Sequence, residues 1–386
     1  MPVVRVSQRG RERILQGHLW VFRSDVRAVD SPSSGDVVEV QDPRGGFLGR
    51  AFYSDSSQIT LRLITTQDQV VDENFWRGRL VEALARRRNL PPTTTAYRWV
   101  HGEADGIPSL VVDRYGDYVS IQTLTAGTDR LKDCFLRLCT ELAEPAGIME
   151  RNDQKARALE GLPLIKGAVF GEVPAAVAVQ EVGVELRVDL REGQKTGLFL
   201  DQRENRVVAG SHAAGKALDV FCYDGGFSLH LASACESVLA VDTSAEALAR
   251  LRVNASVNGF RNIEPMQANG FDVLRELETR EECFDTIVLD PPAFAKNRSS
   301  VAAARRGYKD INLRAMRLLR PGGVLVTSTC SYHISELDFL NILAAAAADS
   351  RSPMVLLDKR AQSRDHPILL AMPETHYLKC VILRKL

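Results

Sequence analysis

The sequence lacks long apolar runs: none of its hydrophobic stretches approaches the roughly 20 residues that a membrane-spanning helix needs. The first residues, M-P-V-V-R-V-S-Q-R-G-R, also contain no apolar core of the kind that a secretory signal peptide carries. We therefore expect a cytosolic protein with no membrane as a partner.

Paired cysteines and an excess of either charge are missing as well. The seven cysteines are odd in number and form no C-x-x-C pair, which argues against a disulfide framework and against a zinc site. Lysine plus arginine and aspartate plus glutamate both number 49, so no global positive field attracts the protein to nucleic acid. Any affinity for nucleic acid must come from local patches.

What is present indicates a soluble globular protein of two or three domains, with 386 residues, 45% of them hydrophobic and 25% charged. Residues 1–72 show short strand patterns separated by turn sequences such as S-P-S-S-G, which predicts a small β-barrel. The basic residues Arg9, Arg11 and Arg13 near its start form either a solvated helix face or a nucleic-acid contact. Residues 73–185 mix helix and strand patterns and predict a central α+β domain.

Strand and helix patterns alternate through the third region, residues 186–386, after a strand expected over 181–189. Further strands are expected near 217–222, 237–241, 263–266, 286–289, 324–328, 354–357 and 377–384. Alternating βα units of this length predict an α/β fold with a parallel, doubly wound sheet. In such sheets ligands bind at the carboxyl ends of the strands.

The strand at 217–222 breaks into a glycine turn, Gly225 and Gly226, where the backbone can pass close to a bound small molecule. Asp242 ends the next strand, where a carboxylate can accept both hydroxyls of a ribose. The turn lacks G-x-G-x-x-G, which disfavours a dinucleotide with its pyrophosphate. A nucleoside with a non-phosphate tail fits better.

Two later strand ends carry groups suited to base chemistry. D-P-P-A-F (Asp290 to Phe294) follows the fourth strand, and its rigid prolines can hold a planar base. T-S-T-C-S ends the fifth strand and places Cys330 ahead of a helix, where a thiol can have a lowered pKa and act as a nucleophile. The alternative is that Cys330 is a buried spacer.

Six segments in order resemble one enzyme family. They are Q-K-T-G-L-F-L-D-Q-R, D-V-F-C-Y-D-G-G-F, V-D-T-S, A-N-G-F-D, D-P-P-A-F and T-S-T-C-S. They resemble the bacterial 23S rRNA 5-methylcytosine methyltransferases of the large-subunit methyltransferase I group. The resemblance implies an N-terminal PUA domain, a central α+β domain and a Rossmann-like class I methyltransferase domain with a seven-stranded, mostly parallel sheet. It also implies S-adenosylmethionine as cofactor, 23S rRNA as partner and a homodimer.

The resemblance further implies which residues form the cofactor site. Cofactor contacts are expected from Asp219, Phe221, Tyr223, Gly225, Gly226, Asp242, Ser244, Asn269, Gly270 and Asp290. From the segment before the first strand, Phe199, Asp201 and Arg203 would close the pocket. Asp219 has the alternative of a turn-capping carboxylate.

The nucleophilic cysteine of 5-methylcytosine enzymes of RNA follows either the fourth or the fifth strand, and Ala293 in the fourth-strand motif leaves Cys330. Thiolate attack at C6 of cytosine gives C5 the enamine character that it needs to accept a methyl group. Asp290 is expected near N3, where it would stabilise the charge that develops. The sequence does not identify the base that removes the C5 proton.

The target cytosine is expected to flip out to this edge. A group following D-P-P-A-F offers cations and a stacking ring, or alternatively forms an exposed helix face. It consists of Arg298, Arg305, Arg306, Tyr308 and Lys309.

Two other functions remain open. D-P-P-A-F is similar to the motif of enzymes that methylate exocyclic amines, whose chemistry needs no cysteine. A non-catalytic RNA-binding or assembly factor that kept the fold is the other alternative.

Overall fold

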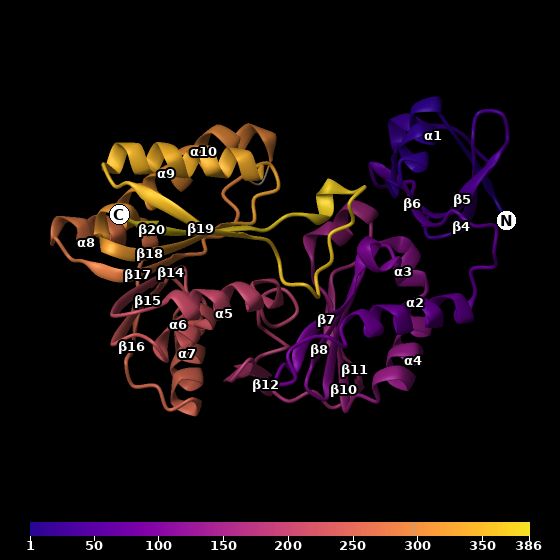
Figure 1. Cartoon of the computed structure of the whole chain (residues 1–386). Helices are drawn as coiled ribbons and strands as arrows, with labels where there is room; N and C mark the ends of the chain where they lie inside the picture. The colour runs from indigo at the N-terminus through magenta and orange to yellow at the C-terminus, as the bar shows by residue number, and fades with distance from the viewer. Residues whose placement is uncertain (296) are drawn as a thin grey trace. The chain divides into compact units, whose positions relative to one another are not determined.

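A computed structural model describes residues 1–295 and 297–386, without the side chain of Arg298. The chain forms two compact units (Figure 1). The first unit comprises residues 1–180, 188–200 and 365–375, and the second comprises residues 181–187, 201–364 and 376–386. The chain therefore passes between the two units several times.

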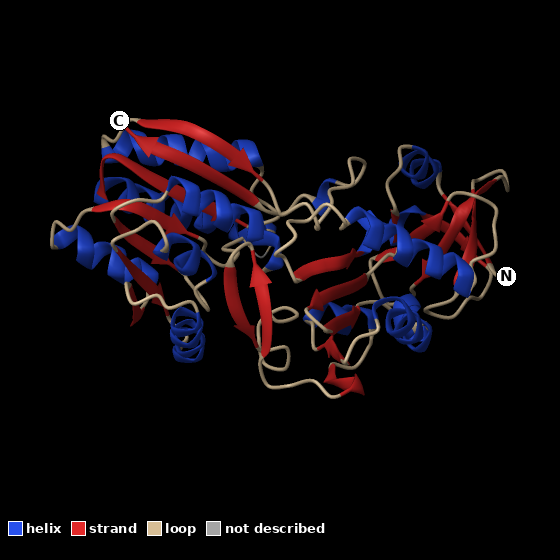
Figure 2. Ribbon diagram, turned by 60° about the horizontal axis from the view of Figure 1, so that its bottom comes forward, coloured by secondary structure: helices blue, strands red, loops and turns tan. Residues whose placement is uncertain are grey.

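The first unit begins with a six-stranded sheet in the order β2-β6-β5-β4-β1-β3. Strands of this sheet are drawn in red near the N-terminus in Figure 2. Its strands are β1 (Val3–Val6), β2 (Trp20–Phe22), β3 (Val26–Val29), β4 (Val37–Gln41), β5 (Phe47–Tyr53) and β6 (Ile59–Thr65). The helix α1 (Gln8–Leu15) begins at Ser7, whose side chain accepts a hydrogen bond from the Gly10 amide. This sheet confirms the β-rich module that the sequence predicted.

A second sheet of the first unit has five strands in the order β11-β10-β9-β8-β7. The elements here are α2 (Glu73–Arg86), β7 (Ala96–His101), β8 (Leu110–Tyr115), β9 (Tyr118–Thr123), α3 (Ala126–Arg130), α4 (Lys132–Ala143), β10 (Gly147–Asn152) and β11 (Ile165–Gly171). The core between this sheet and its helices contains the buried rings of Trp76, Trp99 and Phe135. The mixture of elements agrees with the predicted α+β region.

The strand predicted over 181–189 is wrong in its bounds. The structure has two short strands instead, β12 (Val177–Glu181) and β13 (Val184–Val188). Val182 and Gly183 between them have φ angles of 47° and 87°, so the backbone reverses there. The apolar alternation continues on both sides of this tight turn, so the sequence pattern gave no sign of the turn.

The second unit contains a seven-stranded sheet in the order β16-β15-β14-β17-β18-β20-β19. The strands are β14 (Lys216–Val220), β15 (Ser237–Asp242), β16 (Ile263–Gln267), β17 (Phe284–Leu289), β18 (Leu319–Thr329), β19 (Met354–Arg360) and β20 (Lys379–Lys385). β20 is antiparallel to both of its neighbours, whereas the pairs from β16 to β18 are parallel. This mostly parallel sheet confirms the predicted α/β fold.

Helices cover both faces of this sheet (Figure 1). One face carries α5 (Arg203–His212), α6 (Gly226–Ala232) and α7 (Ala245–Val257), and the other carries α8 (Gly270–Thr279), α9 (Val301–Leu318) and α10 (Glu336–Ser350). The central strands are therefore buried on both sides, and Leu218 and Val220 of β14 are 0% exposed. None of the helices in the described part of the chain is long and apolar enough to cross a membrane.

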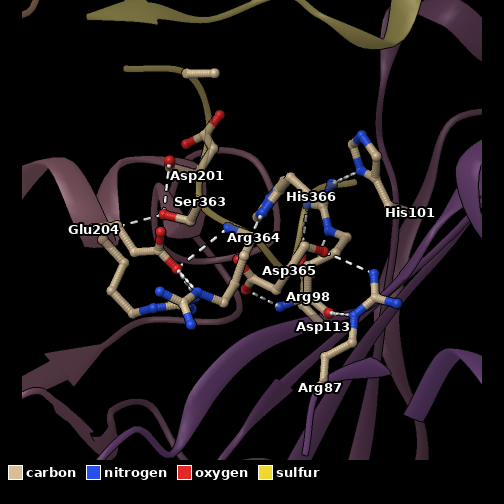
Figure 3. Close-up of polar contacts among 12 residues, drawn as sticks. Arg87, Arg98, His101, Asp113, Asp201, Glu204, Ser363, Arg364, Asp365 and His366 are labelled. Carbon is tan, nitrogen blue, oxygen red and sulfur yellow. Dashed lines mark hydrogen bonds and ion pairs between the residues drawn. The ribbon is translucent and has the colours of Figure 1, made fainter. Parts of the chain in front are cut away.

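The chain leaves the second unit after Arg364 and returns to it at His376. Within the second unit, the Ser363 amide and hydroxyl donate to the Asp201 carbonyl at 2.8 and 3.0 Å (Figure 3). Within the first unit, Arg87 donates to the Asp365 carbonyl at 2.7 Å, and the Arg98 amide donates to the Asp365 carboxylate at 2.9 Å. Each end of this crossing is thus fixed by hydrogen bonds inside its own unit.

Candidate active site

The candidate site lies where the strand order of the seven-stranded sheet reverses. β14 pairs with β15 on one side and with β17 on the other, and ligands of open α/β sheets bind at such switch points. Val220 is level with Val241 of β15 and with Leu289 of β17, and Leu289 is level with Thr327 of β18. The residues that follow these four strands therefore meet at one edge of the sheet.

The turn after β14 has a strained backbone. Phe221, Tyr223 and Gly225 have φ angles of 69°, 50° and 87°, a region that non-glycine residues adopt at a cost of about 1–2 kcal/mol each. The Phe221 amide donates to the Val241 carbonyl at 2.9 Å, which fixes the turn to β15. A Cβ on Gly225 would lie 2.0 Å from a Leu251 methyl carbon. Strained turns that the surrounding structure holds in place are typical of functional sites.

A buried ion pair supports this turn from below, and the sequence did not reveal it. Arg206 donates to both carboxylate oxygens of Glu181 at 2.8 Å, and His230 lies 3.2 Å from the same carboxylate. The Arg206 guanidinium and the His230 hydrogen bond help to lower the pKa of Glu181 to about 2, although burial alone would raise it. A Cβ on Gly226 would lie 2.6 Å from Arg206 Nε, so this glycine makes room for the guanidinium. Glu181 and Arg206 are 25 residues apart, and no local pattern pairs them.

Asp219 is a buried carboxylate inside β14. Ser228 Oγ donates to its Oδ2 at 2.6 Å, whereas its Oδ1 has no hydrogen-bond partner among the described residues. Burial, together with the negative charges of Asp290 and Asp242, raises the pKa of Asp219 to about 7, although the hydrogen bond from Ser228 acts in the opposite direction. A buried acceptor without a partner fits a ligand that brings a donor.

Asp242 ends β15 with its carboxylate held in place by two backbone amides. The Tyr223 amide donates to Oδ2 and the Ser244 amide donates to Oδ1, both at 2.9 Å. Each carboxylate oxygen has a second lone pair, so the group can still accept the hydroxyls of a ribose. The Ser244 hydroxyl itself caps α7 by accepting from the Ala247 amide at 3.1 Å. A contact of Ser244 itself with the cofactor stays a prediction.

Asn269 and Gly270 begin α8 at the same edge. Asn269 Oδ1 caps the helix by accepting from the Phe271 amide at 2.9 Å, while its Nδ2 remains a donor. A Cβ on Gly270 would lie 2.6 Å from Val220 and 2.9 Å from the Phe221 ring, so packing requires this glycine. Contacts of this pair with the cofactor stay a prediction.

The segment before α5 divides between the two units. Asp201 and Arg203 belong to the second unit and are buried, and Tyr377 Oη donates to the Asp201 carboxylate at 2.7 Å. Phe199 belongs to the first unit, where the Lys195 ammonium lies 4.4 Å from the centre of its ring. Closure of a pocket by these three residues stays a prediction.

Asp290 follows β17 and is oriented by a residue that the sequence analysis missed. Gln202 Nε2 donates to Asp290 Oδ1 at 2.8 Å, and Asn205 Nδ2 in turn donates to Gln202 Oε1 at 2.7 Å. Gln202 stands in the quoted Q-K-T-G-L-F-L-D-Q-R segment, so its place in that motif was the available signal.

Cys330 follows β18 and is partly exposed between two fully buried neighbours, Thr329 and Ser331. Ser331 Oγ accepts a hydrogen bond from the Ala295 amide at 3.1 Å and lies 2.9 Å from Tyr308 Oη. The expectation that Tyr308 offers a stacking ring is therefore wrong: the side chain is 0% exposed, in the core beneath the loop. The helical period of α9 turns this position inward, away from its basic neighbours.

The basic residues of α9 lie on its outer side. Arg305 pairs with Asp338, and Lys309 lies 2.6 Å from Asp349, both acidic residues of α10. Arg306 is exposed, and the side chain of Arg298 lies outside the described residues. The described part of the chain contains no group of three or more His, Cys, Asp or Glu residues that could hold a metal ion.

Two protein-family models match the chain. A PUA-like domain matches residues 4–66, and an S-adenosylmethionine-dependent methyltransferase matches residues 167–366. Among curated proteins, Ribosomal RNA large subunit methyltransferase I of Shewanella amazonensis is 40% identical over 385 residues, covering 97% of each chain. The protein of the same name from Aeromonas hydrophila is 40% identical over 387 residues, covering 97% of this chain and 98% of the relative.

Solved structures share the fold over the whole chain. A Streptococcus mutans protein assigned as a SAM-dependent methyltransferase superposes with a TM-score of 0.85 at 20% identity, covering 100% of both chains. A candidate methyltransferase solved in complex with SAH superposes with a TM-score of 0.86 at 21% identity, again over 100% of both chains. At these identities the likeness shows the fold alone.

Proposed function

We propose that this chain, which belongs to the ribosomal RNA large subunit methyltransferase I family, forms 5-methylcytosine in 23S rRNA through a covalent adduct on Cys330. The observation that carries the proposal is the partly exposed Cys330 thiol, which follows β18 at the edge where Asp290 follows the neighbouring strand β17. The methylation of cytosine C5 through Cys330 is the proposal. Dependence on S-adenosylmethionine follows from the family match, which confirms the predicted cofactor.

The residues at the switch point fit this cofactor. Its amino-acid tail and ribose bring hydrogen-bond donors, and the sheet edge offers the Asp219 oxygen without a partner and the fixed Asp242 carboxylate. Asp219 and the strained turn at 221–225 would hold the tail, and Asp242 would hold the ribose. When bound, the cofactor supplies an electrophilic methyl group on a sulfonium.

Cys330 supplies the activation that cytosine lacks, because C5 of a neutral cytosine is a poor nucleophile. The Cys330 thiolate forms a bond to C6, and the C5–C6 π electrons move toward N3 and O2. Asp290, oriented by Gln202, holds a proton at N3 and stabilises the charge that develops there. After C5 is methylated, loss of the C5 proton restores the double bond, and the C6–S bond breaks to return the thiolate.

The substrate proposal combines the names of the relatives with the domain composition. Both relatives are named for large-subunit ribosomal RNA, and this chain carries a PUA-like domain at residues 4–66 that would add contacts away from the chemistry. A cytosine paired in rRNA would be flipped out to reach the thiol. Arg305, Arg306 and Lys309 on α9 would meet the RNA backbone.

Replacement of Cys330 tests this mechanism. The Cys330→Ala variant should lose methyl transfer to naked 23S rRNA while it still binds S-adenosylmethionine. Cys283→Ala is the matched control, because Cys283 is exposed and precedes the amino end of β17, away from the site; it should keep full activity. RNA containing 5-fluorocytosine should trap the wild-type enzyme covalently, since fluorine cannot leave as a proton does. Full activity of Cys330→Ala would instead favour methylation of an exocyclic amine.

A further inference from the structure

A lysine of the neighbouring strand lies opposite the residue that precedes the proposed nucleophile. Lys379 begins β20, which is antiparallel to β18, and its backbone is directly opposite Thr329, the residue before Cys330. Its side chain is turned into the protein, with only 5% of the residue exposed. Buried lysines are rare unless a partner compensates the ammonium charge.

Among the described residues, no carboxylate forms an ion pair with Lys379. Its Nζ donates to the Tyr377 carbonyl at 3.3 Å, and its electrostatic neighbours are Cys330 and Glu336 of α10. Glu336 is itself bound at 2.5 Å by Lys359, a half-exposed lysine of β19. The Cys330 sulfur is therefore the neighbouring group that remains to balance the ammonium within the described part of the chain.

We propose that Lys379 is a positioning residue for the nucleophile: its ammonium lies beside the Cys330 sulfur and stabilises it as the thiolate. This inference rests on the proposed function, because only a reaction through Cys330 needs the thiolate. The thiol proton leaves to solvent before attack, the thiolate pair forms the bond to C6, and the ammonium keeps its three protons throughout. When the C6–S bond breaks, the same ammonium faces the returning thiolate.

A titratable group near the thiol and another near Lys379 agree with this assignment. Burial raises the pKa of Tyr308 on α9, so this hydroxyl stays neutral. Burial and the nearby Lys379 lower the pKa of His376, so this imidazole stays neutral at pH 7. Burial lowers the pKa of Lys379, while the negative charges of a Cys330 thiolate and of Glu336 act in the opposite direction. A thiolate and an ammonium at these two positions therefore stabilise each other.

The test is the rate at which iodoacetamide alkylates Cys330 as a function of pH, read by peptide mass spectrometry on the full chain. Wild type should show a thiol pKa below the ordinary value of about 8.5. Lys379→Met should raise it by about one unit or more, which slows alkylation near pH 7 about tenfold. Lys379→Arg should retain the low value. Lys379→Gln also removes the charge, and it should raise the thiol pKa in the same way if the methionine variant does not fold.

Lys385→Met is the matched control. Lys385 lies on the same strand and the same face, but its Nζ donates to the Met316 and Leu319 carbonyls at 2.8 and 2.7 Å, near the opposite end of β20. It should leave the alkylation profile of Cys330 unchanged. An unchanged profile in both uncharged Lys379 variants would overturn the inference, whatever Cys330→Ala does. A raised thiol pKa together with an active Cys330→Ala would instead overturn only the reaction through Cys330.

Discussion

Replacing Asp219 by asparagine should stabilise the ligand-free protein at neutral and alkaline pH. Asparagine keeps the shape of the side chain and still accepts the hydrogen bond from Ser228. Burial raises the pKa of Asp219 from the ordinary aspartate value of 3.8 to about 7. The rise is about three units at about 1.4 kcal/mol each, so a charged Asp219 costs the native state up to about 4 kcal/mol.

The sign of the pH dependence follows from the direction of this shift. Between pH 3.8 and about 7 the native protein holds a proton on Asp219 that the unfolded chain has lost. The contribution of Asp219 to the free energy of unfolding is therefore fully present below pH 3.8 and is lost as the pH rises through about 7. Asp219→Asn removes this loss, so the gain over wild type should grow from pH 5 to pH 8.

Urea unfolding at a series of pH values measures the effect. Far-UV circular dichroism is the suitable probe, because Trp20, Trp76 and Trp99 all belong to the first unit. Asp272→Asn is the control: this carboxylate on α8 is 73% exposed, and its loss should change stability by about 0.5 kcal/mol or less. The same Asp219 variant should bind S-adenosylmethionine more weakly by calorimetry. Parallel pH profiles for wild type and Asp219→Asn would refute the assignment of a buried, proton-holding carboxylate.

Two further substitutions test the turn and the ribose contact. Gly225→Ala should destabilise the protein by more than about 2 kcal/mol in thermal or urea unfolding, because its Cβ would meet Leu251 at 2.0 Å and its φ is 87°. Adding Leu251→Ala should recover part of this loss. If the effects of the two substitutions simply add, the clash is not the cause. Asp242→Ala should weaken S-adenosylmethionine binding at least about tenfold in calorimetry, since the acceptor for the ribose and the anchor of Tyr223 are lost together; unchanged affinity would place the ribose elsewhere.

The sheet could be predicted because each strand carries its own signal. Buried strands such as β14 and β17 read as short apolar runs, so the points where they end could be located from the sequence. The roles of most residues at these ends came from the family resemblance. The helices between them have the 3.6-residue period, which together with the strands indicates a parallel order. These signals are local, and the sequence therefore predicted that Asp242 and Asp290 lie at the ends of strands.

Contacts between distant segments could not be predicted in the same way. Nothing near Arg206 indicates that Glu181 neutralises it, and nothing near Asp290 indicates that Gln202 orients it. For Tyr308 the local pattern was misleading. Its basic neighbours suggested a surface that faces RNA, but the Tyr308 side chain, which lies between them on the same helix, points into the core. A residue's side of a helix depends on which face packs, which the charge pattern alone did not decide.

The excursion of residues 365–375 limits how the molecule can be dissected. The second unit cannot be expressed as one continuous segment, because residues 365–375, which interrupt it near the end of the chain, belong to the first unit. A fragment beginning after residue 200 would leave the Asp365 carboxylate and carbonyl without Arg98 and Arg87. Expressing the second unit without the first would therefore require a designed linker from Arg364 to His376 rather than a single truncation.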